Sequence, residues 1–225
     1  MNIYYHPLYT KGIDSKSTFP KERYDLIKEQ LVVSELSNII TIKTPTEIET
    51  EDIYRAHAKE YVDAFLNSDL SEKQVREIGL KPWTNKIIQR TLLLTGGSLC
   101  ALDDIYNGAA VAANMAGGTH HAFRDRGSGF CIFNDLAICA NYCLRNFTDF
   151  KNILIVDLDV HQGDGTAALL KNEDSVYTFS MHCESNFPLK KQQSDLDIAL
   201  RRDMGDQTYI RKLASALEKL EEKKN

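Results

Sequence analysis

The stretch Ile153–Gly165 reads ILIVDLDVHQGDG and joins an apolar run to three aspartates and a histidine. Apart from two of the aspartates, residues 153–160 are β-branched or leucine, which predicts a strand buried on both faces of a parallel sheet. A buried ionised carboxylate is costly unless it is paired or binds a metal. Asp157 and Asp159 are two residues apart, so they leave the strand on the same face. Because ligands bind at the carboxyl ends of strands in open parallel sheets, this stretch predicts a site.

The residues that follow the strand support the same interpretation. His161 continues the spacing of the two aspartates, and Asp164 lies between two glycines before the apolar segment 167–170. Turn chemistry alone would explain Asp164, because Asp and Gly favour tight turns and helix starts. It does not explain Asp157 inside the strand, so we favour a functional site.

A second group of ionisable residues lies in AGGTHHAF, where His120 and His121 follow two glycines. In a loop, both rings can reach one pocket, and the glycines allow the backbone to approach closely. Each histidine then needs an acidic partner to fix its tautomer. Taken alone, the pair could equally be two loop histidines in solvent; together with residues 157–164, it favours one shared site.

The composition limits the class of protein. The chain has 225 residues and a net charge of −5, with no basic stripe, which argues against a nucleic-acid-binding surface. The start, MNIYYHPLYTKG, has no signal-peptide pattern, and no segment reaches the roughly 18–20 apolar residues of a membrane span. Five cysteines without a CxxC pair predict reduced thiols, a cytoplasmic location and no cysteine-based zinc site.

The rest of the chain alternates predicted helices and strands, which is typical of an α/β domain. Thr84 is expected to cap the longest helix, in which Gly96 and Gly97 predict close packing. The last helix, over 206–225, is expected to turn Tyr209, Leu213, Leu217 and Leu220 toward a core. Further helices are predicted over 21–34, 71–78, 85–106, 133–146 and 165–171, and strands over 3–5, 39–42, 153–160 and 176–181.

Three motifs, GGTHHAF, GSGFCIFND and IVDLDVHQGDG, resemble those of the zinc-dependent histone deacetylase family, which has the arginase–deacetylase fold. Residues 80–122 and 186–200 are similar particularly to its class IV-like members, and the likeness runs from YYHPLY to about Leu200. The resemblance implies one domain over 1–225, a three-layer α/β/α fold with a mainly parallel sheet. It also implies that the last strands of that sheet are missing here.

The resemblance implies a role for the ionisable residues. His120 and His121 match the family's paired general acid/base histidines, with Asp157 behind the first and Asp164 behind the second. Two of its three zinc ligands are matched by Asp159 and His161. The positions that match the family's monovalent-cation site, for K⁺, are Asp157, Asp159, His161, Ser180 and Met181.

The resemblance also implies a tunnel for an acyl-lysine. Gly129 and Phe130 match one wall and Phe187 is expected on the other. Such a tunnel suits the aliphatic stem of an acylated lysine in a protein, or of an acylated polyamine or related small amide. Gln162 replaces a histidine common in the family at a position that is not a metal ligand.

The expected chemistry is amide hydrolysis. A divalent ion polarises the carbonyl and acidifies bound water, while histidines take and return protons. Mixed Asp and His ligands suit zinc and also allow iron(II), manganese or cobalt.

Two family features have no match in this sequence: the third ligand, an aspartate at a later strand end, and an oxyanion-binding tyrosine after paired glycines. Asp195 and Asp197 lie in SDLDIAL, which matches a family loop. Two ligands alone predict weak metal binding, and loss of the oxyanion donor predicts a rate lower by about 10²–10³-fold. An unpaired sheet edge is also expected. The sequence is compatible with a fragment, a disrupted frame, or half of a protein completed by another polypeptide.

Two other functions are weighed beside an active hydrolase. A non-catalytic protein that binds acyl-lysine or another partner would account for the two unmatched features. An arginase-like ureohydrolase shares the fold, but it needs a two-metal set of aspartates and histidines, which His120 and His121 beside an aromatic tunnel fit less well.

Overall fold

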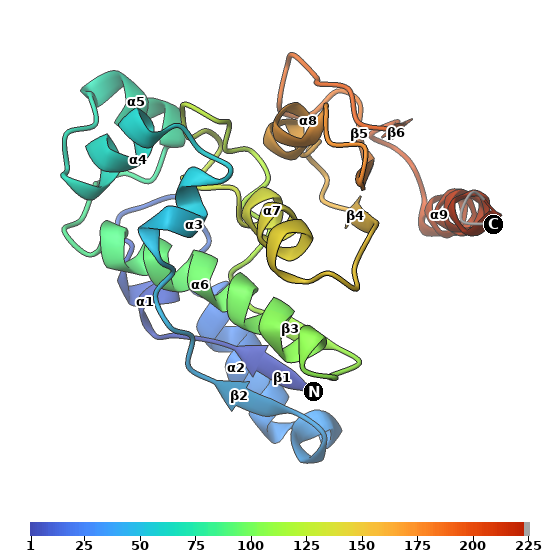
Figure 1. Cartoon of the computed structure of the whole chain (residues 1–225), viewed down its shortest axis with the longest axis horizontal. Helices are drawn as coiled ribbons and strands as arrows, with labels where there is room; N and C mark the ends of the chain where they lie inside the picture. Colours follow the sequence, from blue (N-terminus) through green and yellow to red (C-terminus); the bar gives the residue numbers. More distant parts are fainter. Residues whose placement is uncertain (223–225) are drawn as a thin grey trace.

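The computed structural model describes residues 1–222 and shows an α/β protein whose parallel strands form two separate sheets (Figure 1). This confirms the predicted fold class. The first sheet has the order β2-β1-β3 and the second the order β4-β5-β6. The strands are β1 (Asn2–Tyr4), β2 (Thr41–Lys43), β3 (Ala112–Asn114), β4 (Ile153–Asp157), β5 (Val176–Cys183) and β6 (Leu196–Leu200).

The helices lie close to the predicted positions. α5 begins with a capping box between Ser71 and Gln74 and ends at Gly79, whose φ of +85° is a left-handed cap. Thr84 does not cap α6: its hydroxyl donates to the Gly12 carbonyl at 2.7 Å. The helices are α1 (Leu8–Lys11), α2 (Arg23–Val33), the 3₁₀ helix η1 (Glu35–Asn38), α3 (Thr50–Tyr54), α4 (Lys59–Leu66), α5 (Glu72–Ile78), α6 (Ile87–Tyr106), α7 (Asp135–Asn146), α8 (Asp164–Leu170) and α9 (Asp206–Glu222).

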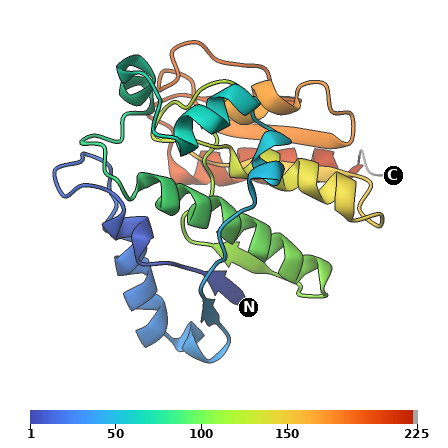
Figure 2. The ribbon, with the colours of Figure 1, turned by 60° about the vertical axis from the view of Figure 1, so that its left-hand side comes forward.

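The larger core surrounds α6, which packs against β1, β3 and α7 (Figure 2). The chain before α3 crosses this helix at Gly96. A Cβ added there would lie 2.0 Å from the Thr46 carbonyl oxygen and 2.9 Å from the Ile48 nitrogen. This confirms the close packing predicted for the glycine pair.

Gly96→Ala is therefore expected to destabilise the protein by about 1–3 kcal/mol, because the overpacking cost exceeds the better helix propensity of alanine. The measurement is urea unfolding followed by circular dichroism. Gly205→Ala is the control, since a Cβ there meets no atom within 4 Å. Equal stability of the two variants would contradict the crowding at Gly96.

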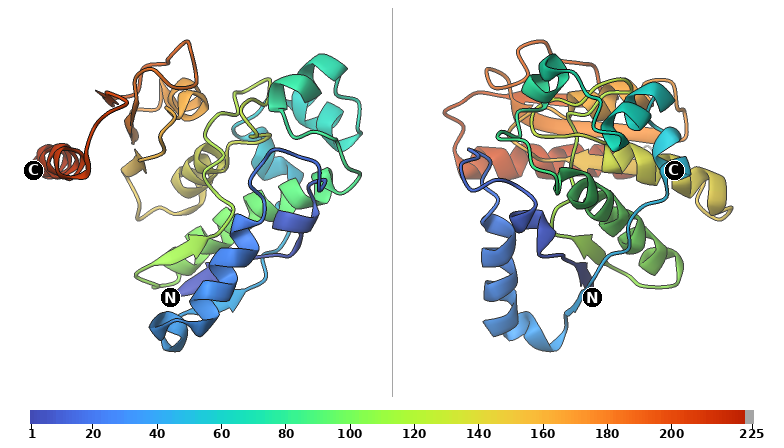
Figure 3. Two further views of the ribbon diagram at one scale, coloured as in Figure 1. Left: turned by 180° about the vertical axis from the view of Figure 1, so that it is seen from behind. Right: turned by 90° about the vertical axis from the view of Figure 1, so that its left-hand side faces the viewer.

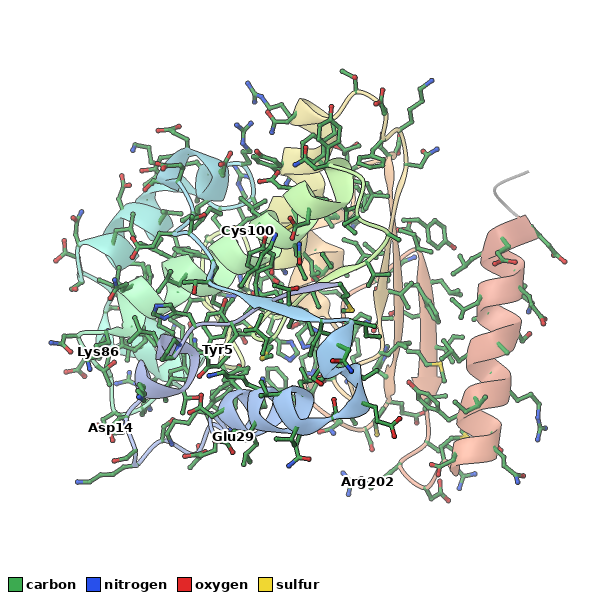
Figure 4. All side chains as sticks on the ribbon, turned by 90° about the horizontal axis from the view of Figure 1, so that it is seen from below. Tyr5, Asp14, Glu29, Lys86, Cys100 and Arg202 are labelled. Atoms are coloured by element: carbon green, nitrogen blue, oxygen red, sulfur yellow. The ribbon has the colours of Figure 1, made fainter. Side chains whose placement is uncertain are left out.

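A second, smaller core lies between α9 and the face of β5 and β6 (Figure 4). Phe179 and Met181 from β5 pack there with Ala216 and Leu220 from α9. Tyr209 and Leu213 face this core as predicted, but the prediction for Leu217 was wrong, because its side chain is 38% exposed. The buried stripe of α9 passes through Ala216 instead.

The strand that carries the central motif differs from its prediction. β4 ends at Asp157, and the residues 158–160 that were predicted to continue it lie outside the strand. Leu154 and Val156 are 37% and 39% exposed, so β4 is not buried on both faces. The reason is its place at the edge of its sheet: within the described residues, β4 pairs only with β5, and the other sheet lies apart from it (Figure 3).

Two strands were not predicted. β3 consists of two alanines and an asparagine, which carry no strand signal. β6 was assigned to a loop, although LDIAL alternates apolar and polar residues.

Candidate active site

The end of β4 is shaped by two side-chain-to-backbone bonds. The Asp159 amide donates to Asp157 Oδ1 at 3.0 Å, and the His161 amide donates to Asp159 Oδ1 at 2.8 Å. Such bonds turn the chain within two residues, because aspartate competes with the sheet for backbone donors. The strand therefore stops at its first aspartate, and the next residues form a loop that leads into α8.

Two buried His–Asp pairs lie beside this loop. His120 Nδ1 lies 2.5 Å from Asp157 Oδ2, and His121 Nδ1 lies 2.6 Å from Asp164 Oδ1. The two imidazole rings are 4.1 Å apart between centroids. A carboxylate at Nδ1 fixes the tautomer with the proton on that nitrogen and leaves Nε2 available to a reacting group. The structure thus brings together the four residues predicted to act as acid/base machinery; their roles stay a prediction.

The surroundings of His120 and His121 shift the pKa values of the two rings in opposite directions. Burial opposes the charged form of His120, but the hydrogen bond and charge of Asp157 outweigh it and raise its pKa above the usual value. Burial lowers the pKa of His121, and the nearby His120 and His161 add to this effect. The hydrogen bond that Asp164 accepts from His121 Nδ1 opposes it.

The predicted metal ligands lie next to these pairs. His161 Nδ1 is 3.0 Å from Asp159 Oδ1, and the His161 ring is 5.8 Å from the His121 ring. Both side chains are accessible, with 37% of His161 and 51% of Asp159 exposed. Catalytic zinc normally has three protein ligands. Within residues 1–222, no group of three or more His, Cys, Asp or Glu side chains is arranged to hold a metal ion. The described residues therefore supply two adjacent donors of suitable type and do not fit a complete zinc site.

Of the residues predicted to hold a monovalent cation, Ser180 and Met181 lie on β5, while Asp157, Asp159 and His161 lie at the end of β4 and in the loop after it. Asp157 is paired in register with Ser180, and Met181 follows it in the strand. The Ser180 hydroxyl is 3.0 Å from His182 Nδ1. The cation itself stays a prediction.

Of the two aromatic residues predicted to line the tunnel, only Phe187 contacts the paired histidines. The ring of Phe187 meets that of His121 edge-on, with centroids 4.8 Å apart. Gly129, at φ +52°, lies between them: a Cβ there would be 2.6 Å from His121 Cδ2 and 3.0 Å from Phe187 Cε1. Phe130 instead packs against Phe19, with centroids 5.3 Å apart. Phe187 and Gly129 thus border the histidines, and Phe130 lies farther along the same loop.

Asp135 supports the site, and sequence reasoning missed it. Its buried carboxylate accepts hydrogen bonds from the Ser98 hydroxyl, the Gly118 amide, and the amide and hydroxyl of Thr119 at 2.6–3.1 Å. These groups belong to the segment just before His120. The FND motif at the start of a predicted helix was the available signal, because Asp and Asn there bind backbone donors.

Gln162 is a second missed support. It is almost fully buried, and its amide pairs with both backbone groups of Gln192 at 2.8 Å. Its nitrogen also donates to Asp197 Oδ1 at 2.8 Å. The residue after His161 therefore fixes the segment that leads from Phe187 to β6.

His57 is a structural residue beneath the site. Its Nε2 accepts from the Asn134 amide at 2.9 Å, so Nδ1 is the donor to the Phe123 carbonyl at 2.8 Å. If Nε2 were also protonated, two N–H donors would face each other and the hydrogen bond from the Asn134 amide would be lost. Burial lowers the pKa of His57 to about 4, which agrees with a neutral ring.

The pKa of His57 predicts acid destabilisation. The folded-state pKa lies below the unfolded value of about 6.5. The contribution of His57 to the free energy of unfolding therefore has its full value above that pH. It falls by up to about 3 kcal/mol as the pH drops toward 4, since the unfolded state binds the proton first. Unfolding free energies measured at pH 7.5 and 4.5 should differ less in His57→Gln than in the original protein. An unchanged difference would contradict a neutral, buried His57.

The fold and the paired histidines agree with a known protein class. The histone deacetylase domain matches residues 17–223, and the chain belongs to that family. It is 42% identical over 219 residues to an uncharacterized protein of Picosynechococcus sp., a match that covers 97% of this chain and 72% of that protein. It is also similar to the acetoin utilization protein AcuC.

With AcuC of Staphylococcus aureus (strain MRSA252) the identity is 30% over 193 residues, covering 82% of this chain and 49% of AcuC. With AcuC of Bacillus subtilis (strain 168) it is 32% over 167 residues, covering 71% of this chain and 42% of AcuC. The chain thus spans about half the length of the AcuC proteins or less.

Proposed function

We propose that this chain is a metal-dependent hydrolase that removes acetyl or other acyl groups from lysine side chains or related amines. At the level of the family, the chain is a deacetylase-like hydrolase. The single observation that carries the finer proposal is the pair of neighbouring His–Asp contacts, at 2.5 and 2.6 Å, at the carboxyl end of β4.

The chemistry needs two proton transfers. An amide is a weak electrophile and its amine a poor leaving group, so water must lose a proton as it attacks and nitrogen must gain one as it leaves. With Nδ1 of each ring held by a carboxylate, Nε2 of His120 and of His121 can make these transfers. Asp157 and Asp164 stabilise the charged rings while they do so.

The substrate class is proposed from the apolar border of the site. The edge of Phe187 lies against His121 and, at 6.0 Å, the ring of His161. An aromatic wall at this place suits the aliphatic stem of an acylated lysine in a protein. An acylated polyamine or another small amide with a similar stem would fit the same wall.

The proposed cofactor is Zn²⁺, with Fe²⁺ as the alternative, and Asp159 and His161 are two of its ligands. Within residues 1–222, no third His, Cys, Asp or Glu side chain is arranged to join them. When bound, such an ion supplies polarisation of the carbonyl and acidification of water. A K⁺ site beside Asp157 and Ser180 is part of the same proposal.

The proposal places the protein in the cytoplasm. It is supported by the five cysteines, all within residues 1–222, which are free of disulfides. Among the described helices, none has the length and apolarity to cross a membrane. No direct contact with nucleic acid is proposed, in line with the net charge of −5.

Acetate release from an acetyl-lysine peptide and from an acetylated polyamine tests the proposal. The full chain is assayed with Zn²⁺ or Fe²⁺. Hydrolysis that chelator removes and His121→Ala abolishes is the expected result. The second candidate, non-catalytic acyl-lysine binding, is favoured by the incomplete ligand set. Peptide binding without turnover, unaffected by chelator, would establish it and overturn the hydrolase.

A further inference from the structure

The loop between β5 and β6, residues 184–195, carries the aromatic wall of the site (Figure 1). Its Phe187 meets the ring of His121 edge-on at 4.8 Å and lies 6.0 Å from the ring of His161. The Phe187 side chain is 39% exposed, so packing in a core does not by itself fix its place. We call residues 184–195 the Phe187 loop. The position of its aromatic ring therefore depends on contacts elsewhere in the loop.

Lys191 holds the backbone on both sides of Phe187. Its ammonium group donates to the Asn186 carbonyl at 2.7 Å and to the Pro188 carbonyl at 2.6 Å. Hydrogen bonds from a charged donor are about twice as strong as those between neutral groups. Because the two carbonyls flank Phe187 in the chain, this one side chain fixes the path of the loop where the aromatic ring projects.

Gln162 ties the Phe187 loop to the loop that follows β4. Its amide pairs with the backbone N–H and carbonyl of Gln192, both at 2.8 Å, and its nitrogen also donates to Asp197 Oδ1 at 2.8 Å. Asp197 Oδ2 accepts in turn from the Ser194 amide at 2.8 Å. Gln162 is 1% exposed, and a satisfied buried network of this kind holds its members rigidly. The residue next to His161 thus fixes the far end of the loop that carries the aromatic wall.

We propose that Gln162 and Lys191 form a clamp that positions Phe187 against the paired histidines and thereby sets the affinity of the site for the aliphatic stem of an acylated amine. Gln162 anchors the loop at Gln192, and the preceding residue, Lys191, fixes the carbonyls around the aromatic ring. Both act through Phe187, so they are positioning residues. This role rests on the proposed function, because it needs the Phe187 wall to contact the stem.

The clamp acts on binding and leaves the chemistry of the histidines unchanged. Phe187 contacts the stem equally in the ground state and the transition state, so displacing its ring raises KM without lowering kcat. His121 is held separately by Asp164, at 2.6 Å from its Nδ1. A displaced Phe187 is also detectable without substrate, because its ring current shifts the ring protons of His121, whose centroid is 4.8 Å away.

Lys191→Met tests the clamp, because it removes the ammonium group and keeps a long unbranched side chain. Lys190→Met is the matched control, since it makes the same change at the adjacent, exposed lysine of the same loop. NMR of the full chain records the ring-proton shifts of His121, and Phe187→Leu supplies the shift expected without the aromatic ring. Lys191→Met and Gln162→Leu should move the His121 shifts toward that value, and Lys190→Met should not.

The same variants are compared for binding of an acetyl-lysine peptide and of an acetylated polyamine, measured by calorimetry. Lys191→Met should raise both dissociation constants by about tenfold, as loss of an apolar contact in a substrate pocket does. The two ligands should lose affinity equally, because they share the aliphatic stem. Lys190→Met should leave both constants unchanged. Lys191→Arg keeps a cationic donor and should retain most of the affinity.

Three results would overturn the proposal: unchanged His121 shifts and affinities in Lys191→Met, equal losses in Lys190→Met, or a loss confined to the peptide. The last result would mean that the Phe187 loop contacts residues beside the acyl-lysine and not its stem. Circular dichroism of each variant establishes that it is folded. A chain that binds neither ligand would remove the proposed function, whereas the His121 shifts test the positioning of Phe187 without any ligand.

Discussion

Replacing Asp164 with asparagine is expected to lower kcat/KM for acyl-lysine hydrolysis by about 10²–10⁴-fold, as loss of a histidine-orienting carboxylate does in other hydrolases. Asp164 Oδ1 lies 2.6 Å from His121 Nδ1, and both side chains are buried. A neutral amide cannot stabilise a charged ring as a carboxylate does. It can also present its NH₂ group to Nδ1, which would move the imidazole proton to Nε2 and block the nitrogen needed for catalysis.

The control is Asp203→Asn, which changes an exposed carboxylate paired with Arg201 and should leave hydrolysis unchanged. The assay uses the full chain supplied with Zn²⁺ or Fe²⁺. Imidazole nitrogen NMR of the chain alone adds a readout that needs no turnover, because it reports the tautomer of His121. Unchanged kinetics and an unchanged tautomer in Asp164→Asn would remove the assigned role of this pair.

The convergence of the two motifs could be predicted because its signals are local and chemical. Asp157 inside an apolar strand needs a partner, and the tandem His120–His121 needs carboxylates. Contacts of 2.5 and 2.6 Å now join them. Helix α5 could also be predicted, because Ser71 and Gly79 are residue types that favour the start and the end of a helix.

Other features depend on the tertiary structure and lay beyond sequence reasoning. The exposure of Val156 follows from which strands lie beside β4, and its own residues predicted burial on both faces. Thr84 has the side chain of a helix cap, but in the folded protein its hydroxyl donates to the distant Gly12 carbonyl instead. No role for Gln162 was evident from the sequence. Its hydrogen-bond partner Gln192 is distant in the chain, so their pairing could not be predicted.

Asp135→Ala is expected to lower the free energy of unfolding by about 3–4 kcal/mol, among the largest effects of a single substitution. Its carboxylate is 1% exposed and accepts from two backbone amides and two hydroxyls. Hydrogen bonds to a charged group contribute about 1.5–3 kcal/mol each, and they are not additive. Removing the carboxylate leaves all four donors without this acceptor.

The comparison of Asp135→Asn with Asp135→Ala separates hydrogen bonding from packing. Asparagine keeps one acceptor oxygen but brings two N–H donors toward groups that are themselves donors, so it should recover at most half of the lost stability. Asp149→Ala removes an exposed carboxylate and should stay within about 0.5 kcal/mol of the original protein. Urea unfolding of the three variants measures these differences. Because Asp135 holds Gly118 and Thr119 directly before His120, the same variant should also weaken acyl-lysine hydrolysis. A loss below about 1 kcal/mol in Asp135→Ala would mean that the loop of the tandem histidines is held by other contacts.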